Sequence, residues 1–534
     1  MTDHIVIVGG GPGGYEAAHV AAQLGADVTV VDTDGVGGSA VLTDCVPSKT
    51  LIATAELMAD MSTAQELGVN FHDHEGDAAT SISVDLGRVN ARVKKLAADQ
   101  STDIAARLDR DGVRLVKGRG RLGPDLTVEV DGETLRADAI IVATGAAPRT
   151  LPSARPDGER ILTWEQVYDL TEVPEKLVVV GSGVTGAEFA SAYLSLGIDV
   201  TLVSSRDRVL PGEDADASAV LEDVLTRRGM HVLGQSRMQS VTRDGDTVTV
   251  TLTDGRTVSG SHCILALGSI PNTADLGLEE AGVVTDEVGF ITVDRVSRTS
   301  ARGIYAAGDC TGVLMLASVA AMQGRIAMWH FLGDAVAPLD LKKVSSNVFT
   351  APEIDTVGWS QQAVDAGEIE AGVVMLPLAG NARAKMQGVR DGFVKLFCRP
   401  GTGIVVGGVV VGPRASELIH PVSIAVAESL TADQLAHAFT VYPSMSGSVA
   451  EAARRLHRVC PASLPRNPGP LVAVGSAHAC TLGDSERSSL GGDLTPCAAP
   501  VQPGSCSPCS RAHSCCPSCP CCPCCPPPRP RSRA

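Results

Sequence analysis

Most of this sequence lacks the basic blocks typical of nucleic-acid-binding proteins and the long apolar runs typical of membrane proteins. Residues 1–456 contain no basic block, and the formal net charge is −17, so neither a nucleic-acid surface nor a polybasic membrane anchor is expected. No apolar run reaches the roughly 18 residues that an integral membrane span needs. The opening MTDHIVIVGG lacks the pattern of a secretory signal, so a cytoplasmic location is expected.

Cysteine is scarce in the first 456 residues and abundant after them. Only four of the 16 cysteines lie in residues 1–456. Residues 457–534 interleave cysteine with proline and contain no Phe, Trp or Tyr, so this tail is predicted to be disordered because it could bury little apolar surface. Two alternatives stay open. One is a metal site at Cys506–Cys509 and Cys516–Cys519, which lacks a fold to place its ligands, and the other is a shifted reading frame.

The patterned part of the chain opens on a dinucleotide-binding fingerprint. Residues 4–32 predict a buried strand, an Ala-rich helix and a second strand, with Gly9, Gly11 and Gly14 in the spacing G-x-G-x-x-G. These glycines allow a tight turn, the approach of a pyrophosphate to the backbone, and close packing of helix on strand. Asp32 ends the second strand, where a carboxylate accepts hydrogen bonds from ribose hydroxyls.

The same fingerprint recurs in residues 176–205. Gly181, Gly183 and Gly186 repeat the glycines. Asp32 follows Gly9 by 23 residues, and Ser204 follows Gly181 by the same interval. Two such sites predict two different dinucleotides, a bound flavin and a nicotinamide that exchanges.

The second fingerprint lacks the carboxylate that would repel a 2′-phosphate. Ser204 and Ser205 are followed by Arg206 and Arg208, and hydroxyls with a guanidinium suit a phosphate. The pattern predicts that NADPH is accepted, and favours it over NADH. The alternative is that both arginines are solvated surface charges.

With later motifs, these fingerprints resemble the pyridine nucleotide–disulfide oxidoreductases, the flavoprotein family of dihydrolipoamide dehydrogenase, glutathione reductase and mercuric reductase. The resemblance covers about residues 3–456. It rests on IIVATGAAPR (140–149), ILALGSIPNT (264–273), GIYAAGDCTG (303–312) and VFTAPEIDTVGWS (348–360), which occur in the family order. It implies bound FAD and an NAD(P)H donor, with Gly145, Gly308 and Asp309 at the flavin. Taken alone, Asp309 could be only a helix cap.

The resemblance also implies an architecture. The expected class is α/β, with two Rossmann-like dinucleotide-binding domains and an α+β dimerisation domain. Residues 1–150 and 280–340 would form the FAD domain, 151–279 the NAD(P) domain, and 345–456 the interface of a homodimer.

The stretch GGSAVLTDCVPSKT (37–50) departs from the disulfide-reducing members. They carry two cysteines separated by four residues and followed by PSK; Cys45 matches the second cysteine, and Ala40 stands in place of the first. A dithiol relay needs both sulfurs, one to attack the substrate disulfide and one to resolve the mixed disulfide. That exchange therefore cannot be completed here.

A second departure lies near the end of the patterned region. Disulfide-reducing members carry HPTxSE, in which the histidine is the acid/base and the glutamate orients it. This chain has YPSMSG, with Tyr442 at the histidine position and Gly447 at the glutamate position. A phenol titrates near 10 and an imidazole near neutrality, so the usual acid/base is missing. His437 lies upstream of the motif and is expected on a helix surface.

Both departures predict that electrons leave the flavin directly. A quinone-type acceptor needs no thiol, and the local sequence resembles an actinobacterial branch of the family with NAD(P)H:quinone reductase activity. Two alternatives are dihydrolipoamide dehydrogenase activity and a non-catalytic flavoprotein that serves as a redox sensor or complex subunit.

Four residues are candidates for the reaction. In the family, a Lys and Glu at the positions of Lys49 and Glu188 pair beside the flavin N5, where the cation stabilises the reduced ring. Cys45 would make a charge-transfer contact as a thiolate or only fill space. Tyr442, reaching the flavin of the partner chain, would donate a hydrogen bond to a quinone oxygen or replace the lost histidine without a role. No metal is expected.

Overall fold

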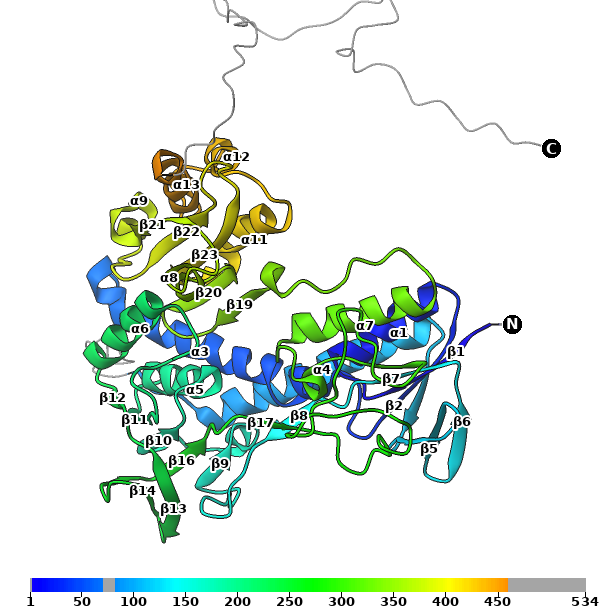
Figure 1. Ribbon diagram of the computed structural model, residues 1–534. Helices are drawn as coiled ribbons and strands as arrows, with labels where there is room; N and C mark the ends of the chain where they lie inside the picture. The colour runs from blue at the N-terminus through cyan, green and yellow to red at the C-terminus, as the bar shows by residue number, and fades with distance from the viewer. Residues whose placement is uncertain (1, 71–81, 460–534) are drawn as a thin grey trace, which may run out of the picture. The chain divides into compact units, whose positions relative to one another are not determined.

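A computed structural model describes residues 2–70 and 82–459 (Figure 1). The last described helix, α13 (Gly447–Val459), continues three residues into the segment predicted to be a tail. The predictions made for residues 460–534 lie outside the described part of the chain.

The first sheet is parallel and has the strand order β18–β7–β1–β2–β3. Its strands are β1 (His4–Val8), β2 (Asp27–Asp32), β3 (Arg114–Lys117), β7 (Ala139–Val142) and β18 (Ile304–Ala306). Parallel strands covered on both faces need continuous apolar runs, and Ile5, Val6 and Ile7 of β1 are fully buried. The strand order reverses at β1, so a crevice is expected at the carboxyl ends of β1 and its neighbours.

Helices cover one face of this sheet and short strands cover the other. Helices α1 (Pro12–Gln23) and α7 (Ala317–Phe331) pack on Ile5 and Ile7, and they lie side by side in Figure 1. They approach so closely that a Cβ added at Gly324 would lie 2.1 Å from the carbonyl oxygen of Gly13. Antiparallel strands β4 (Arg121–Gly123), β5 (Thr127–Val130) and β6 (Glu133–Arg136) cover the other face.

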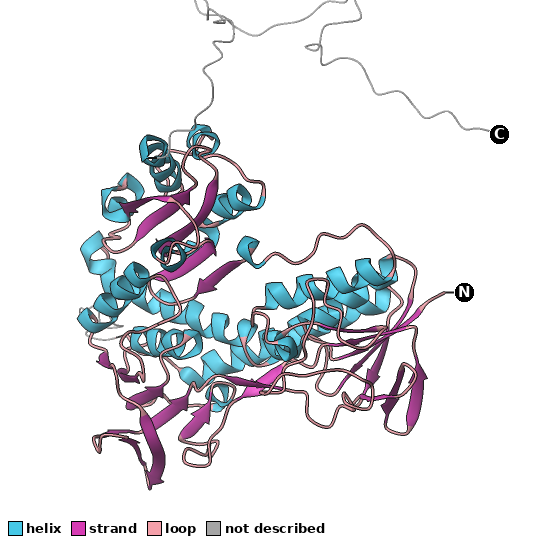
Figure 2. Cartoon of the chain, viewed as in Figure 1, coloured by secondary structure: helices cyan, strands magenta, loops and turns pink. Residues whose placement is uncertain are grey.

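The second sheet repeats this plan in the order β12–β11–β10–β16–β9. Its parallel strands are β9 (Ile161–Thr163), β10 (Lys176–Val180), β11 (Asp199–Val203), β12 (His231–Leu233) and β16 (His262–Leu265). Helix α5 (Val184–Ser195) packs on one face. The antiparallel strands β13 (Met238–Asp244), β14 (Thr247–Leu252) and β15 (Thr257–Gly260) cover the other. In the view of Figure 2, helices lie above the strands of these two sheets.

Two long helices and a pair of short strands link the two parallel sheets. Helix α3 (Cys45–Thr63) packs against both α4 (Leu86–Arg110) and α5. Strand β8 (Ala146–Pro148) pairs with β17 (Ser269–Pro271) in antiparallel fashion. This pair brings the motif at 140–149 next to the motif at 264–273.

The third sheet is antiparallel, in the order β19–β20–β23–β22–β21. Its strands are β19 (Ser345–Val348), β20 (Glu353–Gly358), β21 (Gly372–Pro377), β22 (Phe393–Cys398) and β23 (Val405–Gly412). Helices α11 (His420–Ala427) and α13 pack on one face. The expected α/β class, with two parallel sheets and a separate α+β region, is confirmed. The boundaries proposed at 150, 280 and 345 stay predictions.

A buried ion cluster joins the third sheet to the second. Nζ of Lys395 on β22 lies 2.9 and 2.8 Å from the two carboxylate oxygens of Asp214 and 2.6 Å from Asp216. Asp214 caps α6 (Ala215–Arg227), and the side chains of Lys395 and Asp214 are each 2% exposed. Loss of one partner would leave a buried charge uncompensated, so this cluster fixes the two regions against each other.

Candidate functional site

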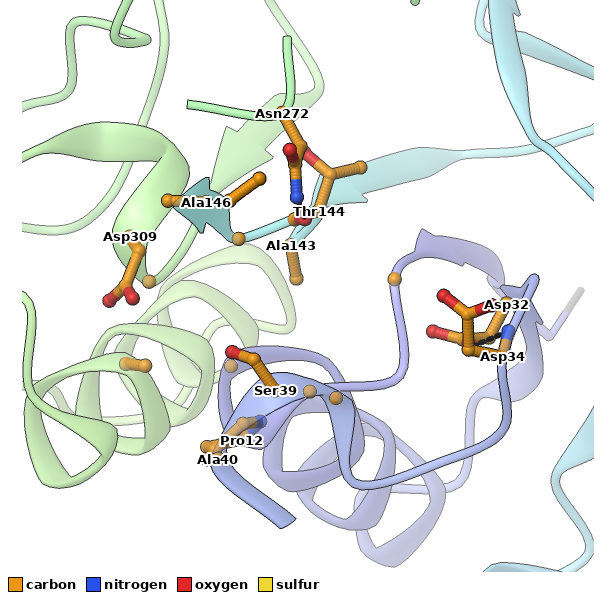
Figure 3. A pocket seen from close by; sticks show the side chains of 18 of the residues that line it. Pro12, Asp32, Asp34, Ser39, Ala40, Ala143, Thr144, Ala146, Asn272 and Asp309 are labelled. Carbon is orange, nitrogen blue, oxygen red and sulfur yellow. Dashed lines mark hydrogen bonds between the residues drawn. The ribbon is translucent and has the colours of Figure 1, made fainter. Parts of the chain in front are cut away.

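A pocket of about 660 Å³ opens at the carboxyl ends of β1, β2, β7 and β18 (Figure 3). It is where the reversed strand order places a crevice. The predicted residues that line it are Gly9, Gly11, Asp32, Cys45, Gly145, Gly308 and Asp309. Asp32 and Asp309 lie on opposite sides of the pocket, with Ala40 between them (Figure 3).

The first glycine turn has the geometry that a pyrophosphate requires. Gly9 has a φ of +106°, and a Cβ there would lie 2.2 Å from the carbonyl oxygen of Ala143. A Cβ at Gly14 would lie 1.9 Å from the carbonyl oxygen of Gly9, so only glycine lets α1 approach the turn. Gly11 caps α1 without a side chain. The helix N-terminus therefore faces the pocket, where its amides favour an anion.

Asp32 organises the loop that follows β2. Its carboxylate accepts hydrogen bonds from the backbone amides of Gly10 at 2.6 Å and of Asp34 and Gly35 at 2.8 Å. These bonds turn the loop along the pocket wall. The carboxylate itself lines the pocket, and its contact with a ribose stays a prediction.

Asp309 lies on the opposite side of the pocket at the start of η3 (Asp309–Thr311). Gly308 has a φ of +85° and donates its amide to Oε1 of Gln323 at 2.8 Å. The cap residue of η3 is Gly308, so Asp309 is not the helix cap that the sequence alone allowed. Burial raises the pKa of Asp309. Within the described residues nothing donates a hydrogen bond to its carboxylate, so this acid is available to a ligand.

Several lining residues were not predicted from the sequence. Asn272 lies in the motif at 264–273. Its side-chain Nδ2 donates to the carbonyl oxygen of Thr144 at 3.1 Å, and its backbone amide donates to the carbonyl oxygen of Gly145 at 3.0 Å. These bonds hold the end of β17 at the pocket, and the family motif that contains Asn272 was the signal that could have identified it. Other polar lining residues are Asp44, Arg119, Thr144 and Glu165. The glycine turn, the anion-binding helix end and the unpartnered Asp309 fit FAD.

Lys49 and Glu188 meet although 139 residues separate them. Nζ of Lys49 on α3 lies 2.8 Å from Oε2 of Glu188 on α5. Oε1 of Glu188 accepts the amide of Phe349 at 2.9 Å, and the Lys49 ammonium lies 4.9 Å from the centre of the Phe349 ring. Burial lowers the pKa of Lys49, but the Glu188 carboxylate more than offsets this and leaves the pKa raised. Lys49 is therefore held as a cation one helical turn beyond Cys45.

The thiol of Cys45 lines the pocket close to Ala40 of α2 (Gly38–Leu42). Burial, with the Asp44 carboxylate beside it, raises the pKa of Cys45 to about 12. The chain therefore favours the thiol over the thiolate, which supports the space-filling alternative. Cys45, Cys263, Cys310 and Cys398 form no disulfide in the described residues, and the last three are buried.

The second glycine turn matches the first, but its surroundings differ. Gly181 has a φ of +114°, and Gly183 caps α5. A Cβ at Gly186 would lie 1.8 Å from the carbonyl oxygen of Gly181. Ser204 is fully buried, and its hydroxyl lies 2.7 Å from that of Ser182. Its predicted contact with a nucleotide stays a prediction, and the observed bonds give it a role in shaping the turn.

Of the two arginines that follow, only one is oriented toward solvent. Nη2 of Arg208 donates to the carbonyl oxygen of Pro211 at 3.1 Å. Arg206 is exposed, and none of the described residues accepts a hydrogen bond from its guanidinium. Its amide donates to Oγ of Ser204 at 3.1 Å. Ser204 thus positions Arg206, the residue left to contact a 2′-phosphate.

Tyr442 does not line the pocket of its own chain. It is 85% exposed, on a segment where Phe439 and Val441 are exposed as well. His437 ends α12 (Ala432–His437) and is exposed, as expected for a helix-surface residue. The contribution of Tyr442 to a partner's site stays a prediction.

The described residues offer neither a membrane-spanning helix nor a metal site. No helix among them combines the length and the hydropathy needed to cross a bilayer. In the same residues, no group of three or more His, Cys, Asp or Glu is arranged to hold a metal ion.

Comparison with known proteins agrees with the motifs. Residues 3–324 match the family described as pyridine nucleotide-disulphide oxidoreductase, and residues 344–453 match its dimerisation domain. An NAD(P)H dehydrogenase (quinone) of Mycobacterium tuberculosis is 56% identical over 470 residues, covering 85% of this chain and 94% of that protein. A dihydrolipoyl dehydrogenase of Zymomonas mobilis is 32% identical over 463 residues, covering 84% and 97%.

A solved structure gives the same result for the fold. The crystal structure of LpdA from Mycobacterium tuberculosis matches with a TM-score of 0.80 and 55% identity, covering 85% of this chain and all of that chain. The dimerisation-domain match supports a homodimer, and members of the family use FAD with NAD(P)H. The resemblance predicted from the motifs is confirmed: the chain belongs to the pyridine nucleotide-disulphide oxidoreductases.

Proposed function

We propose that this protein is a flavin-dependent NAD(P)H dehydrogenase that reduces a quinone-type acceptor without a dithiol relay. The observation that carries the proposal is the pair Ala40 and Cys45 at the pocket. One position has no sulfur, and the other has a thiol whose pKa is raised to about 12. Thiol–disulfide exchange needs a thiolate and a second sulfur, and these two positions of the described pocket supply neither.

The donor side of the reaction is assigned to the second fingerprint. The N-terminus of α5 would receive the pyrophosphate of NAD(P)H, and Arg206 would contact the 2′-phosphate of NADPH. FAD, when bound, supplies a two-electron carrier between donor and acceptor. Lys49 and Glu188 are not among the residues that line the pocket, but Lys49 lies one helical turn beyond Cys45, which does. Held as a cation by Glu188, Lys49 would stabilise negative charge that develops on the reduced flavin.

The acceptor side is supported by a relative that matches most of this chain. The Mycobacterium tuberculosis protein that is 56% identical is named NAD(P)H dehydrogenase (quinone). Tyr442 would approach the acceptor from the second subunit of a homodimer, because in its own chain the phenol lies in solvent. The cytoplasmic location stays a prediction, which cell fractionation would test.

The test follows NADPH oxidation by the full-length protein with a soluble naphthoquinone and, in parallel, with lipoamide. Rapid turnover with the quinone and none with lipoamide is expected. Turnover with lipoamide would favour dihydrolipoamide dehydrogenase activity and overturn the proposal. Bound FAD with slow turnover for every acceptor would favour a non-catalytic flavoprotein.

A further inference from the structure

Quinone reduction leaves a proton to be accounted for. A quinone becomes a quinol by taking up two electrons and two protons, and NAD(P)H supplies both electrons and one proton as a hydride. The second proton needs an acid within reach of the acceptor. Tyr442 and Gly447 provide neither an imidazole nor a carboxyl group, so the family's usual acid is missing and this proton comes from solvent or from another residue.

Asp44 lies on the pocket wall, immediately before Cys45. It is the cap residue of α3, a position where an aspartate normally accepts hydrogen bonds from the first helical amides. Here the side chain makes no capping bond. Within the described residues no group donates a hydrogen bond to its carboxylate. The carboxylate of Asp44 therefore does not cap the helix, and it is available to a molecule bound in the pocket.

The charged groups around Asp44 come from several elements. Lys49 and Cys45 lie on α3, Glu188 on α5, Asp309 on η3, and Glu165 in the loop before η2 (Gln166–Asp169). Burial raises the pKa of Asp44 to about 6, Lys49 opposes this shift, and the neighbouring acids add to it. A donor is most effective when its pKa lies near the working pH.

The ionisable neighbours of Asp44 are less suited to this role. The carboxylate of Glu165 already accepts Oγ1 of Thr43 at 3.2 Å. Lys49 is bound to Glu188 at 2.8 Å with a raised pKa, so it retains its proton. Cys45 is a much weaker acid than Asp44. Asp309 lies on the side of the pocket assigned to the cofactor.

We propose that Asp44 is the proton donor of quinone reduction, replacing the acid/base that is absent at Tyr442 and Gly447. In this step the carboxyl O–H bond of Asp44 breaks, and a new O–H bond forms on the reduced quinone. The carboxylate then regains a proton from water, which reaches this half-buried side chain. The overall change is NAD(P)H, quinone and one proton to NAD(P)⁺ and quinol. The inference rests on the proposed function.

The test compares two acceptors that differ in their need for protons. A soluble naphthoquinone takes up protons, whereas ferricyanide takes up only electrons. In full-length Asp44→Asn with its flavin content verified by absorbance, the ratio of the quinone rate to the ferricyanide rate is expected to fall about a hundredfold. Asp60→Asn, on an exposed part of the same helix, is the matched control and should keep the wild-type ratio.

The pH dependence gives a second readout. The protonated carboxyl is the active form, so the wild-type quinone kcat should fall as pH rises through about 6, and the ferricyanide rate should not follow it. Asp44→Glu should retain this fall, displaced along the pH axis, and Asp44→Asn should lack it.

Two results would overturn the inference. One is an unchanged ratio of the quinone rate to the ferricyanide rate in Asp44→Asn, whether both rates stay at the wild-type level or both fall equally; an equal fall would assign Asp44 to an earlier step. The other is a wild-type quinone profile that is flat between about pH 5 and 8, which decides the matter even if Asp44→Asn fails to fold. A wild-type protein that reduces ferricyanide but no quinone would instead refute the proposed function itself, and this inference with it.

Discussion

The turn after β1 and the turn after β10 are nearly the same piece of backbone. Gly9 and Gly181 have φ angles of +106° and +114°. The amides of these two glycines donate to Val31 at 2.8 Å and to Val203 at 2.9 Å. Their cap residues, Gly11 and Gly183, have φ of −70° and −72°. Both turns therefore present the same helix end to a pyrophosphate.

The two turns differ in the residue that ends the second strand. Asp32 gathers three backbone amides and stays on the wall of a large pocket. Ser204 is buried against Ser182 and positions the amide of Arg206. The two turns thus share one backbone shape and differ in the strand-end side chain and the loop that it holds, and this difference is where we expect the choice of cofactor to be made.

The largest effect is expected when one methyl group is added to the third glycine of either turn, because the two variants should lose different cofactors. Gly14→Ala puts a Cβ 1.9 Å from a backbone oxygen, so α1 must shift and the protein should be purified with almost no flavin. Gly186→Ala makes the equivalent clash at 1.8 Å and should keep FAD yet lose reduction by NAD(P)H. Flavin absorbance and stopped-flow reduction measure these effects, with dithionite as the control reductant. Loss of FAD from both variants would contradict the assignment.

A smaller effect is expected at the contact between the two sites. Glu188→Gln removes the charge that holds Lys49, and Lys49→Met removes the cation itself. Each should slow flavin reduction by NADPH about ten- to a hundredfold, measured by stopped flow with FAD content verified. Because the pKa of Lys49 is raised, its loss of charge should not reduce the wild-type rate below about pH 10. A rate unchanged in Lys49→Met would make the pair structural.

The next effect concerns the choice of nucleotide. Arg206→Ala should lower kcat/KM for NADPH about tenfold, because the exposed guanidinium is lost, while kcat/KM for NADH stays within about twofold. Arg206→Lys keeps the charge and should recover part of the loss. A wild-type protein with kcat/KM for NADH well above that for NADPH would contradict the predicted preference.

The smallest effect is expected when a carboxylate is introduced at the end of β11, where the second fingerprint lacks one. Ser205 is exposed next to Arg206, so Ser205→Asp introduces a negative charge without burying it. Repulsion of the 2′-phosphate should lower kcat/KM for NADPH about two- to fivefold, and the effect should shrink at high salt. Ser205→Asn is the neutral control, and an equal loss in both variants would indicate a steric cause.

How much the sequence predicts depends on the range of the interaction. The glycine turns, Asp32 and the order of elements follow from local spacing, and all occur as expected. The contact of Lys49 with Glu188 crosses 139 residues, so no periodicity reveals it and only the family resemblance did. The burial of Ser204 depends on Ser182 of the glycine turn, a tertiary contact that spacing alone does not encode. No sequence pattern singled out Asp44, because its uncapped side chain and its place on the pocket wall are features of the folded chain.

Glu188 also bears on attempts to recombine this protein with its relatives. Its carboxylate accepts the Lys49 ammonium of α3 and the amide of Phe349, and Ser191 accepts the amide of Ala351 at 3.0 Å. Two stretches far apart in the chain, α3 and residues 349–351, therefore converge on two side chains of α5 that lie one helical turn apart. A chimaera that imports a foreign α5 must carry a carboxylate and a hydroxyl at this spacing. Otherwise the segment between β19 and β20 loses its anchor on α5, and the swap fails through the third sheet although both glycine turns are intact.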